Sequence, residues 1–98
     1  MWILRTITEG FDEKVFRLLP GEPKTIGRAT GADFIVDAAL VSRVHCRLTV
    51  LSDGALDLKD LQSTNGTFVN GARVETARLA PGDTLQVGRV ELLVMKEE

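Results

Sequence analysis

Three short polar clusters contain the residue types that bind anions: Gly27-Arg28, Ser42-Arg43-Val44-His45 and Ser63-Thr64-Asn65-Gly66-Thr67. A guanidinium presents a planar fork of donors that suits a phosphate group. Hydroxyl groups add further donors, and an asparagine amide carries both a donor and an acceptor, which is what the backbone of an extended peptide requires. A glycine lets the chain turn tightly beside them. These clusters therefore predict a surface that binds an anion without transforming it.

Simpler interpretations of the same residues stay open at this point. An arginine that follows a strand, as we expect of Arg28, is most often a solvated surface residue. Ser42 has a second interpretation, in which its hydroxyl only satisfies backbone amides in a turn. We expect His45 to be a structural, hydrogen-bonding residue on the polar phase of a strand. The residues by themselves indicate an all-β domain with a candidate anion-binding loop surface.

Catalytic and metal-binding patterns are missing from the sequence. It contains no phosphate-binding P-loop, no dinucleotide-binding glycine motif and no zinc-protease motif. Ser42 and His45 lie three residues apart, so on one strand they face opposite ways, and no third group orients them. With one histidine and one cysteine, the chain lacks a convincing ligand set for zinc. We expect no enzyme activity, no cofactor and no metal.

Composition argues against some classes of binding partner. The chain has 98 residues and a net charge of −2, and its aromatic content is 5%. This predicts a single domain over residues 1–98, with neither the basic field nor the stacking surface that nucleic acids need. A β-barrel that binds nucleic acid is therefore disfavoured. The apolar start, Met1–Leu4, is too short for a signal peptide or a membrane span, and the lone Cys46 permits no internal disulfide. We expect a cytoplasmic protein without membrane contact, and an inert core thiol at Cys46.

Strand-like segments recur every 8 to 12 residues or so, the rhythm of a sandwich or barrel. The clearest alternates apolar Val44, Cys46, Leu48 and Val50 with polar residues, which places those four side chains on one buried face. Others are expected over residues 2–7, 14–19, 56–59, 84–87 and 90–94. Residues 72–79 allow at most one helical turn and no wide apolar face, so the fold class is all-β.

Turn residues separate these segments. Asn70-Gly71 is the strongest hairpin signal, because both residues tolerate the positive φ of a two-residue type I′ turn. Asp53-Gly54 and Pro81-Gly82-Asp83 predict two further turns, and Pro20-Gly21-Glu22-Pro23 ends the second strand.

At the same clusters the sequence resembles the forkhead-associated (FHA) domain family. Gly27-Arg28 is similar to the family's G-R pair, and residues 42–45 match its S-R-x-H. Residues 58–71 match its longer run, which ends S-x-N-G-T-x-x-N-G, and Leu79-Ala80-Pro81-Gly82-Asp83 with Gly88 resembles its L-x-x-G-D…G tail. The resemblance covers about residues 24–94, with all four motifs in order and correctly spaced. It implies an FHA-type β-sandwich of about eleven strands with recognition loops at one end.

The resemblance also implies a function, which is the binding of extended peptides that contain phosphothreonine. By motif position, Arg28, Ser42, Arg43 and Thr64 would contact the phosphate. Asn65 would hydrogen-bond the peptide backbone. Four further residues would brace the loops: Gly27, His45, Gly66 and Asn70. The apolar loop Asp37–Val41 contains no Arg or Lys, so we expect no strong demand for an acidic residue three places after the phosphothreonine.

The expected partner is therefore a threonine-phosphorylated protein in a Ser/Thr kinase pathway. We expect the domain to be monomeric, either alone or as part of a larger chain. The alternative function is a structural or oligomerising module that binds independently of phosphate.

Overall fold

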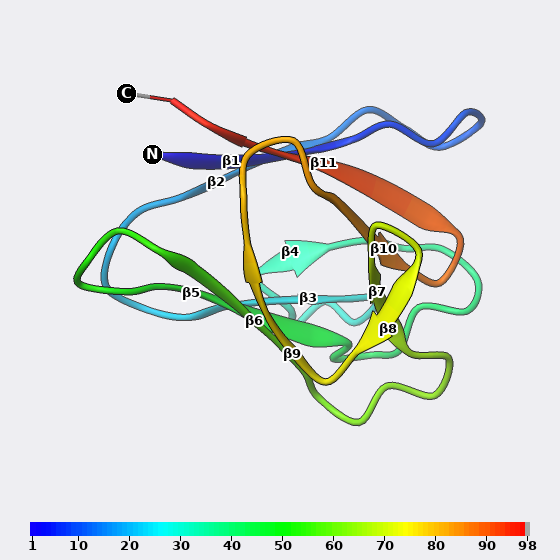
Figure 1. The fold of residues 1–98 in the computed structure, drawn as a ribbon. Coiled ribbons are helices and arrows are strands. Elements are labelled where there is room, and N and C mark those ends of the chain that lie inside the picture. Colours follow the sequence, from blue (N-terminus) through cyan, green and yellow to red (C-terminus); the bar gives the residue numbers. More distant parts are fainter. Residues whose placement is uncertain (98) are drawn as a thin grey trace.

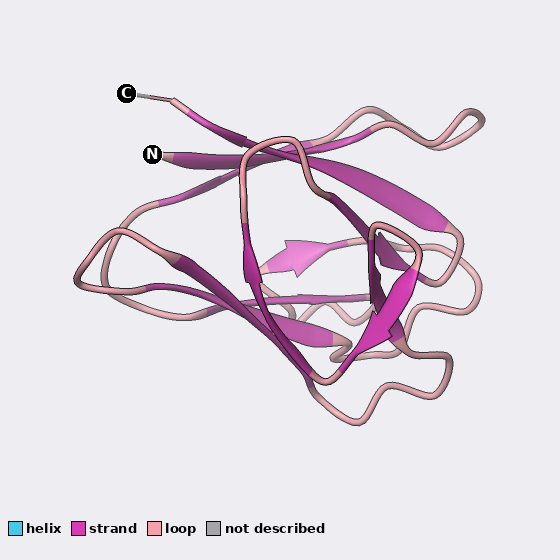
Figure 2. Ribbon diagram, in the orientation of Figure 1, coloured by secondary structure: helices cyan, strands magenta, loops and turns pink. Residues whose placement is uncertain are grey.

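The structure is a computed structural model that describes residues 1–97. It contains eleven strands and, within those residues, no helix (Figure 2). The strands are β1 (Trp2–Thr6), β2 (Val15–Leu18), β3 (Lys24–Gly27), β4 (Phe34–Ile35), β5 (Cys46–Val50), β6 (Leu56–Asp60), β7 (Thr67–Val69), β8 (Ala72–Val74), β9 (Thr76–Leu79), β10 (Thr84–Val87) and β11 (Val90–Lys96). The expected all-β class and strand number are confirmed. No helix long and apolar enough to cross a membrane occurs among residues 1–97.

The strands form two sheets that face each other (Figure 1). One has six strands in the order β2-β1-β11-β10-β7-β8, and the other has five in the order β4-β3-β5-β6-β9. All the strand pairs are antiparallel except β3 with β4. Alternate residues of each sheet fill the space between them, among them the fully buried Leu4, Leu48, Leu58, Leu85 and Leu92. Burial of this apolar surface is the main force that holds the sheets together.

The predicted turns are present. Asn70 and Gly71 have φ values of 50° and 85°, as a type I′ turn requires, and they join β7 to β8. Gly54 has a φ of 87° and its amide donates to the Leu51 carbonyl, which closes the β5–β6 hairpin. Asp83 N donates to the Ala80 carbonyl in the turn before β10.

The prediction for residues 44 and 45 is wrong. Val44 does not share the buried face of β5, because its side chain is 43% exposed, whereas His45 is fully buried instead of lying on a polar face. The reason is that β5 begins at Cys46, so the alternation of a pleated strand does not extend back to residues 44 and 45. Residues 72–79 form no helical turn; they make β8 and β9, which belong to different sheets.

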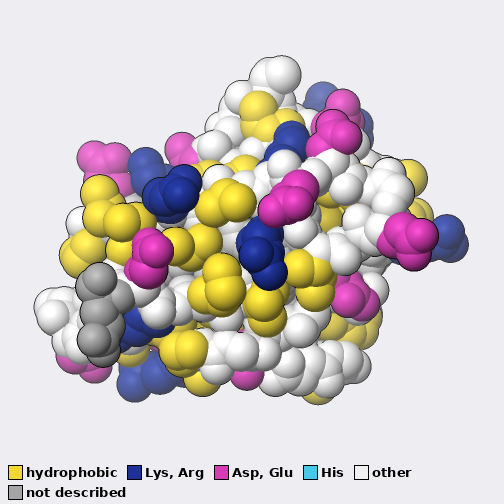
Figure 3. All heavy atoms as spheres, turned by 90° about the horizontal axis from the view of Figure 1, so that it is seen from above, with side chains coloured by type: hydrophobic (Ala, Val, Ile, Leu, Met, Phe, Trp, Pro, Cys, Tyr) yellow, Lys and Arg dark blue, Asp and Glu magenta, His cyan; other side chains and the backbone are white. Residues whose placement is uncertain are grey.

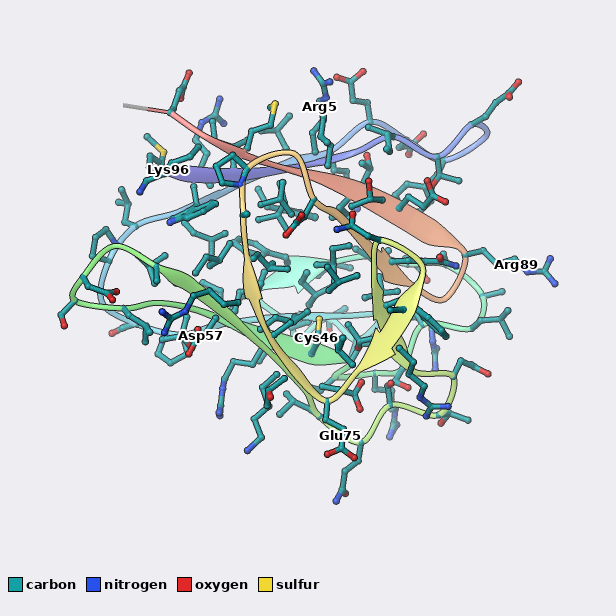
Figure 4. The ribbon with its side chains drawn as sticks, in the orientation of Figure 1. Arg5, Cys46, Asp57, Glu75, Arg89 and Lys96 are labelled. Carbon is teal, nitrogen blue, oxygen red and sulfur yellow. The ribbon has the colours of Figure 1, made fainter. Side chains whose placement is uncertain are left out.

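Cys46 lies on the inner side of β5, between the two sheets (Figure 4). Burial in apolar surroundings raises the pKa of its thiol far above the ordinary range, and the nearby Asp60 carboxylate adds to the effect. This thiol is part of the core, as predicted.

Candidate functional site

The loops that carry the three polar clusters converge at one end of the sandwich. Figure 1 shows the segments that follow β3, precede β5 and follow β6 on the right, while the chain termini lie on the left. Residues of these three loop segments line an open surface pocket of ≈ 580 Å³, which we call the cradle. Eight residues line it: Arg28, Ala39, Leu40, Val41, Ser42, Arg43, Thr64 and Asn65. Five of these were predicted from the sequence as ligand-binding residues.

Arg28 enters the cradle at the point where β3 ends. Its backbone amide donates to the Ser42 carbonyl at 3.0 Å, and its side-chain Nε donates to the Val41 carbonyl at 3.1 Å. The second bond fixes the plane of the guanidinium through a neutral partner. The side chain forms no ion pair within residues 1–97, so its charge and its terminal Nη groups are free for a ligand.

Ser42 and Thr64 come from different loops and are joined directly. The Thr64 backbone amide donates to Ser42 Oγ at 3.0 Å. Because the serine oxygen accepts this bond, its own hydroxyl hydrogen can point into the cradle. This hydrogen bond holds the loop before β5 against the loop after β6. The hydroxyl side chains of Ser42 and Thr64 and the guanidinium of Arg28 therefore line the same pocket.

His45 ties the same two loops together from inside the protein. Its Nδ1 accepts a hydrogen bond from the Ser42 backbone amide at 3.0 Å, and its Nε2 lies 2.9 Å from the Gly66 carbonyl. An amide can only donate, so Nδ1 carries no proton and Nε2–H is the donor to Gly66. The neutral ring is fully buried with both nitrogens satisfied. His45 therefore fixes the backbone on both sides of the cradle.

Asp60 forms a second clamp, which sequence reasoning missed. Its Oδ1 accepts hydrogen bonds from Ser63 Oγ at 2.5 Å and Thr67 Oγ1 at 2.7 Å, and its Oδ2 accepts one from Ser63 N at 3.2 Å. Partial burial acts to raise the pKa of Asp60, but the hydrogen bonds from Ser63 and Thr67 outweigh it, so the pKa is lowered. A carboxylate three residues before a serine is the pattern of a side-chain-closed turn, which was the available sequence signal.

Two glycines permit close approaches behind the cradle. A Cβ atom on Gly27 would lie 2.0 Å from the Arg43 carbonyl oxygen, so only glycine lets β3 approach the loop before β5 this closely. Gly66 has a φ of 90°, and a Cβ atom there would lie 2.8 Å from Nε of Arg73.

The two asparagines occupy different places. Asn65 lines the cradle, and its Nδ2 donates to the Leu40 carbonyl at 3.0 Å, which leaves Oδ1 as an acceptor. Asn70 lies outside the cradle: its Oδ1 accepts a hydrogen bond from Thr84 N at 2.9 Å and its Nδ2 donates to Asp83 at 3.0 Å. It fixes the turn between β7 and β8 against β10.

All the charged side chains that line the cradle are positive. Its lining includes Arg28 and Arg43 but no Asp or Glu. Within residues 1–97 no cluster of three or more His, Cys, Asp or Glu side chains has the arrangement of a metal site. Two cations, two hydroxyls and an amide in one open pocket are the donor groups that suit a multiply charged anion.

Several known proteins are related to this chain in sequence. The chain is 43% identical over 75 residues to an ABC transporter ATP-binding/permease protein of Mycobacterium tuberculosis. It is 38% identical over 80 residues to the glycogen accumulation regulator GarA of Mycolicibacterium smegmatis. These alignments cover 76% and 81% of the chain but only 9% and 50% of the two relatives. The chain thus spans half the length of one relative and a small part of the other.

A solved structure from an analysis of phosphothreonine-dependent FHA domain interactions superimposes with a TM-score of 0.88 at 32% identity. It covers 99% of this chain and 97% of the other. The profile of the FHA domain matches residues 24–88, which is more than half of the chain and includes every residue of the cradle. The chain therefore belongs to the FHA domain family.

Proposed function

We propose that this domain binds a phosphothreonine-containing segment of a partner protein in the cradle. One observation carries the proposal: Arg28, Arg43, Ser42 and Thr64 line one pocket that has no carboxylate, and the guanidinium of Arg28 has no competing ion pair within residues 1–97. A phosphorylated side chain has about −1.5 to −2 charges and three acceptor oxygens at pH 7, which matches these donors.

In this proposal each cradle residue has a role. Arg28 and Ser42 hold phosphate oxygens directly, and Thr64 and Arg43 add contacts. Asn65 hydrogen-bonds the peptide backbone next to the phosphothreonine. Gly27, His45, Gly66 and Asn70 act from behind as bracing residues. Charge-assisted hydrogen bonds contribute roughly 1.5–3 kcal/mol each, so a few of them, less the costs of ordering and desolvation, give binding in about the micromolar range.

The remaining features of the proposal follow from the family. The relatives of this chain include a regulator, GarA, and an oxoglutarate dehydrogenase inhibitor of Corynebacterium diphtheriae. We infer that residues 1–98 are one binding domain that catalyses no reaction and uses no cofactor. We further infer a cytoplasmic, monomeric adaptor that acts in a Ser/Thr kinase pathway.

Titration with matched peptides tests this function. Threonine, phosphoserine and phosphothreonine versions of one peptide are compared by isothermal titration calorimetry against the wild type, Arg28→Ala and Ser42→Ala. Arg17→Ala is the matched control, because Arg17 is exposed on β2 in the six-stranded sheet. We expect binding of the phosphothreonine version alone, lost in both cradle variants and kept in the control. Equal binding of the unphosphorylated peptide would instead support the phosphate-independent module.

A further inference from the structure

The cradle is the first of three adjoining hollows on this domain. The second has a volume of ≈ 440 Å³ and includes Gln62, Ser63 and Arg73 in its lining. Ser63 immediately precedes Thr64 of the cradle, so the loop after β6 borders both hollows. The third, of ≈ 540 Å³, lies on the outer face of β5, β6 and β9, and shares Lys59 and Thr76 with the second. The three hollows together reach from the cradle to the face of the five-stranded sheet, and we call them the track.

Cations are concentrated along the track. Half of the chain's 12 Lys and Arg residues line the three hollows: Arg28 and Arg43 the first, Lys59 and Arg73 the second, and Arg47 and Arg78 the third, which shares Lys59. Only Asp57, Asp60 and Glu75 represent the chain's 14 acidic residues there. A chain with a net charge of −2 thus presents a locally positive path.

Two of the three acidic groups already have partners. Asp57 pairs with Arg78 at 3.5 Å, the one ion pair among residues 1–97, and the Asp60 carboxylate accepts hydrogen bonds from Ser63 and Thr67. These contacts leave the balance of six cations against three carboxylates unchanged, so the path has a net positive charge.

The most informative pair on the track is Arg47 with Lys59. These residues lie directly opposite each other on β5 and β6, and neither forms an ion pair within the described chain. Like charges at directly opposite positions destabilise a sheet. A negatively charged ligand on this face relieves that repulsion, which makes the pair a favourable place for acidic side chains. Figure 4 shows Arg5 on the opposite side of the molecule from Glu75 of the track.

The opposite sheet offers no comparable surface. Its outer face carries apolar side chains with cations and carboxylates scattered among them (Figure 3). The positive surface is therefore a property of one face and not of the whole domain.

From this geometry, and resting on the proposed function, we propose that the partner is a phosphothreonine protein whose chain continues into an acidic segment, and that this segment lies along the track. Ser42 and Arg47 are five residues apart, so the chain between them spans at most about 18 Å. An extended ligand advances about 3.4 Å per residue. The straight line therefore corresponds to about five ligand residues, and a ligand that follows the loop after β6 covers a longer course than that line. Acidic residues roughly four to eight places from the phosphothreonine then reach Arg47 and Lys59, beyond the apolar loop whose residues 39–41 line the cradle.

The test uses three phosphothreonine peptides: one with neutral flanks, and one each with Glu at the fourth to eighth places before or after the phosphothreonine. Binding is measured by fluorescence anisotropy at low and at physiological salt. Three or four exposed ion pairs predict that one of the acidic peptides binds about 5- to 20-fold more tightly than the neutral one at low salt, with a smaller gain at higher salt.

Two double variants test whether this gain in affinity comes from the track. Arg47→Gln with Lys59→Gln removes two of these ion pairs, so it cuts the gain about three- to fivefold and leaves binding of the neutral peptide unchanged. The matched control, Arg5→Gln with Arg17→Gln, removes the same charge from the other sheet and keeps the gain.

Other results overturn the proposal. If neither acidic peptide binds more tightly than the neutral one, the proposed role of the track is refuted. The same holds if the full gain in affinity persists in the Arg47 and Lys59 double variant. Neither result contradicts the proposed function of the cradle. Displacement of the acidic peptide by an oligodeoxythymidylate of equal charge, at equal concentration, assigns the surface to polyanions in general. Failure of the neutral phosphopeptide to bind refutes the proposed function itself.

Discussion

His45 gives the sharpest test of how the cradle is built, because it touches no ligand in the proposed function. The substitution His45→Ala removes both of its hydrogen bonds and leaves the Ser42 amide and the Gly66 carbonyl without a partner. An unsatisfied buried polar group costs about 1–3 kcal/mol, and the space left by the ring adds to that. We expect the free energy of unfolding to fall by about 3–5 kcal/mol. Domains of this size are stable by roughly 5–15 kcal/mol, so the loss approaches the whole stability at the low end of that range, and the folded fraction of the variant is measured before its binding.

The effect on binding is separate from this loss of stability. Without His45, the Ser42 backbone and the loop at Gly66 are no longer fixed relative to each other, so the serine hydroxyl is displaced from the phosphate position. Loss of about one charge-assisted hydrogen bond, roughly 1.5–3 kcal/mol, predicts phosphopeptide binding weaker by about 10- to 100-fold.

The assay compares His45→Ala with Leu48→Ala at 10 °C. Leu48 is fully buried in the same strand and contacts no cradle residue through a hydrogen bond, and its truncation costs a similar 2–5 kcal/mol or so. Urea unfolding gives the stability of each protein, and calorimetric titration gives its affinity. Leu48→Ala is expected to bind within twofold of the wild type. If folded His45→Ala also binds that well, His45 does not position the cradle and the reasoning is refuted.

Three further predictions concern the framework behind the cradle. Gly27→Ala should lower the free energy of unfolding by about 2–4 kcal/mol, because its Cβ would collide with a backbone oxygen. Gly31→Ala, which has open space, is the control in urea unfolding, and an equal effect in both would contradict the account. Cys46, whose thiol pKa is raised by burial, should react with a thiol reagent only on unfolding, and labelling within minutes in native buffer would argue against its burial. Asp60 has a lowered pKa, so its carboxylate stabilises the fold at neutral pH and this contribution is lost as the pH falls below about 4. The stability difference between wild type and Asp60→Asn should therefore shrink from pH 7 to pH 3, and a constant difference would refute the clamp.

Local patterns in the sequence predicted those parts of the fold that depend on neighbouring residues. The β7–β8 hairpin follows from the positive φ that Asn70 and Gly71 tolerate, and most of β5 follows from its alternation. β4 was not predicted because it has only two residues, which pair with Ile26 and Gly27 of β3. Such short strands exist through tertiary pairing and have no periodicity of their own.

The candidate site also has some features that local sequence predicts and others that depend on tertiary contacts. The residues that line the cradle were evident, since Arg28, Ser42 and Thr64 stand in recognisable motifs. The bracing contacts were not, because they join residues distant in sequence: Thr64 N reaches Ser42 Oγ across 22 positions and His45 reaches Gly66 across 21. The burial of His45 was mispredicted for the same reason. The repulsive pairing of Arg47 with Lys59 also depends on strand register, which a single sequence does not specify.

The cradle is held by neutral contacts, and this has a consequence for affinity. The Val41 carbonyl orients Arg28, and the Thr64 amide meets Ser42 Oγ, so neither group is positioned by a carboxylate. A carboxylate partner would orient the guanidinium equally well, but an incoming phosphate would then have to compete with it. Carbonyl and amide partners fix the donors while leaving the positive charge uncompensated, which lowers both the ordering cost and the electrostatic cost of binding. Asp60, the nearby carboxylate, is instead held by Ser63 and Thr67 and does not line the cradle.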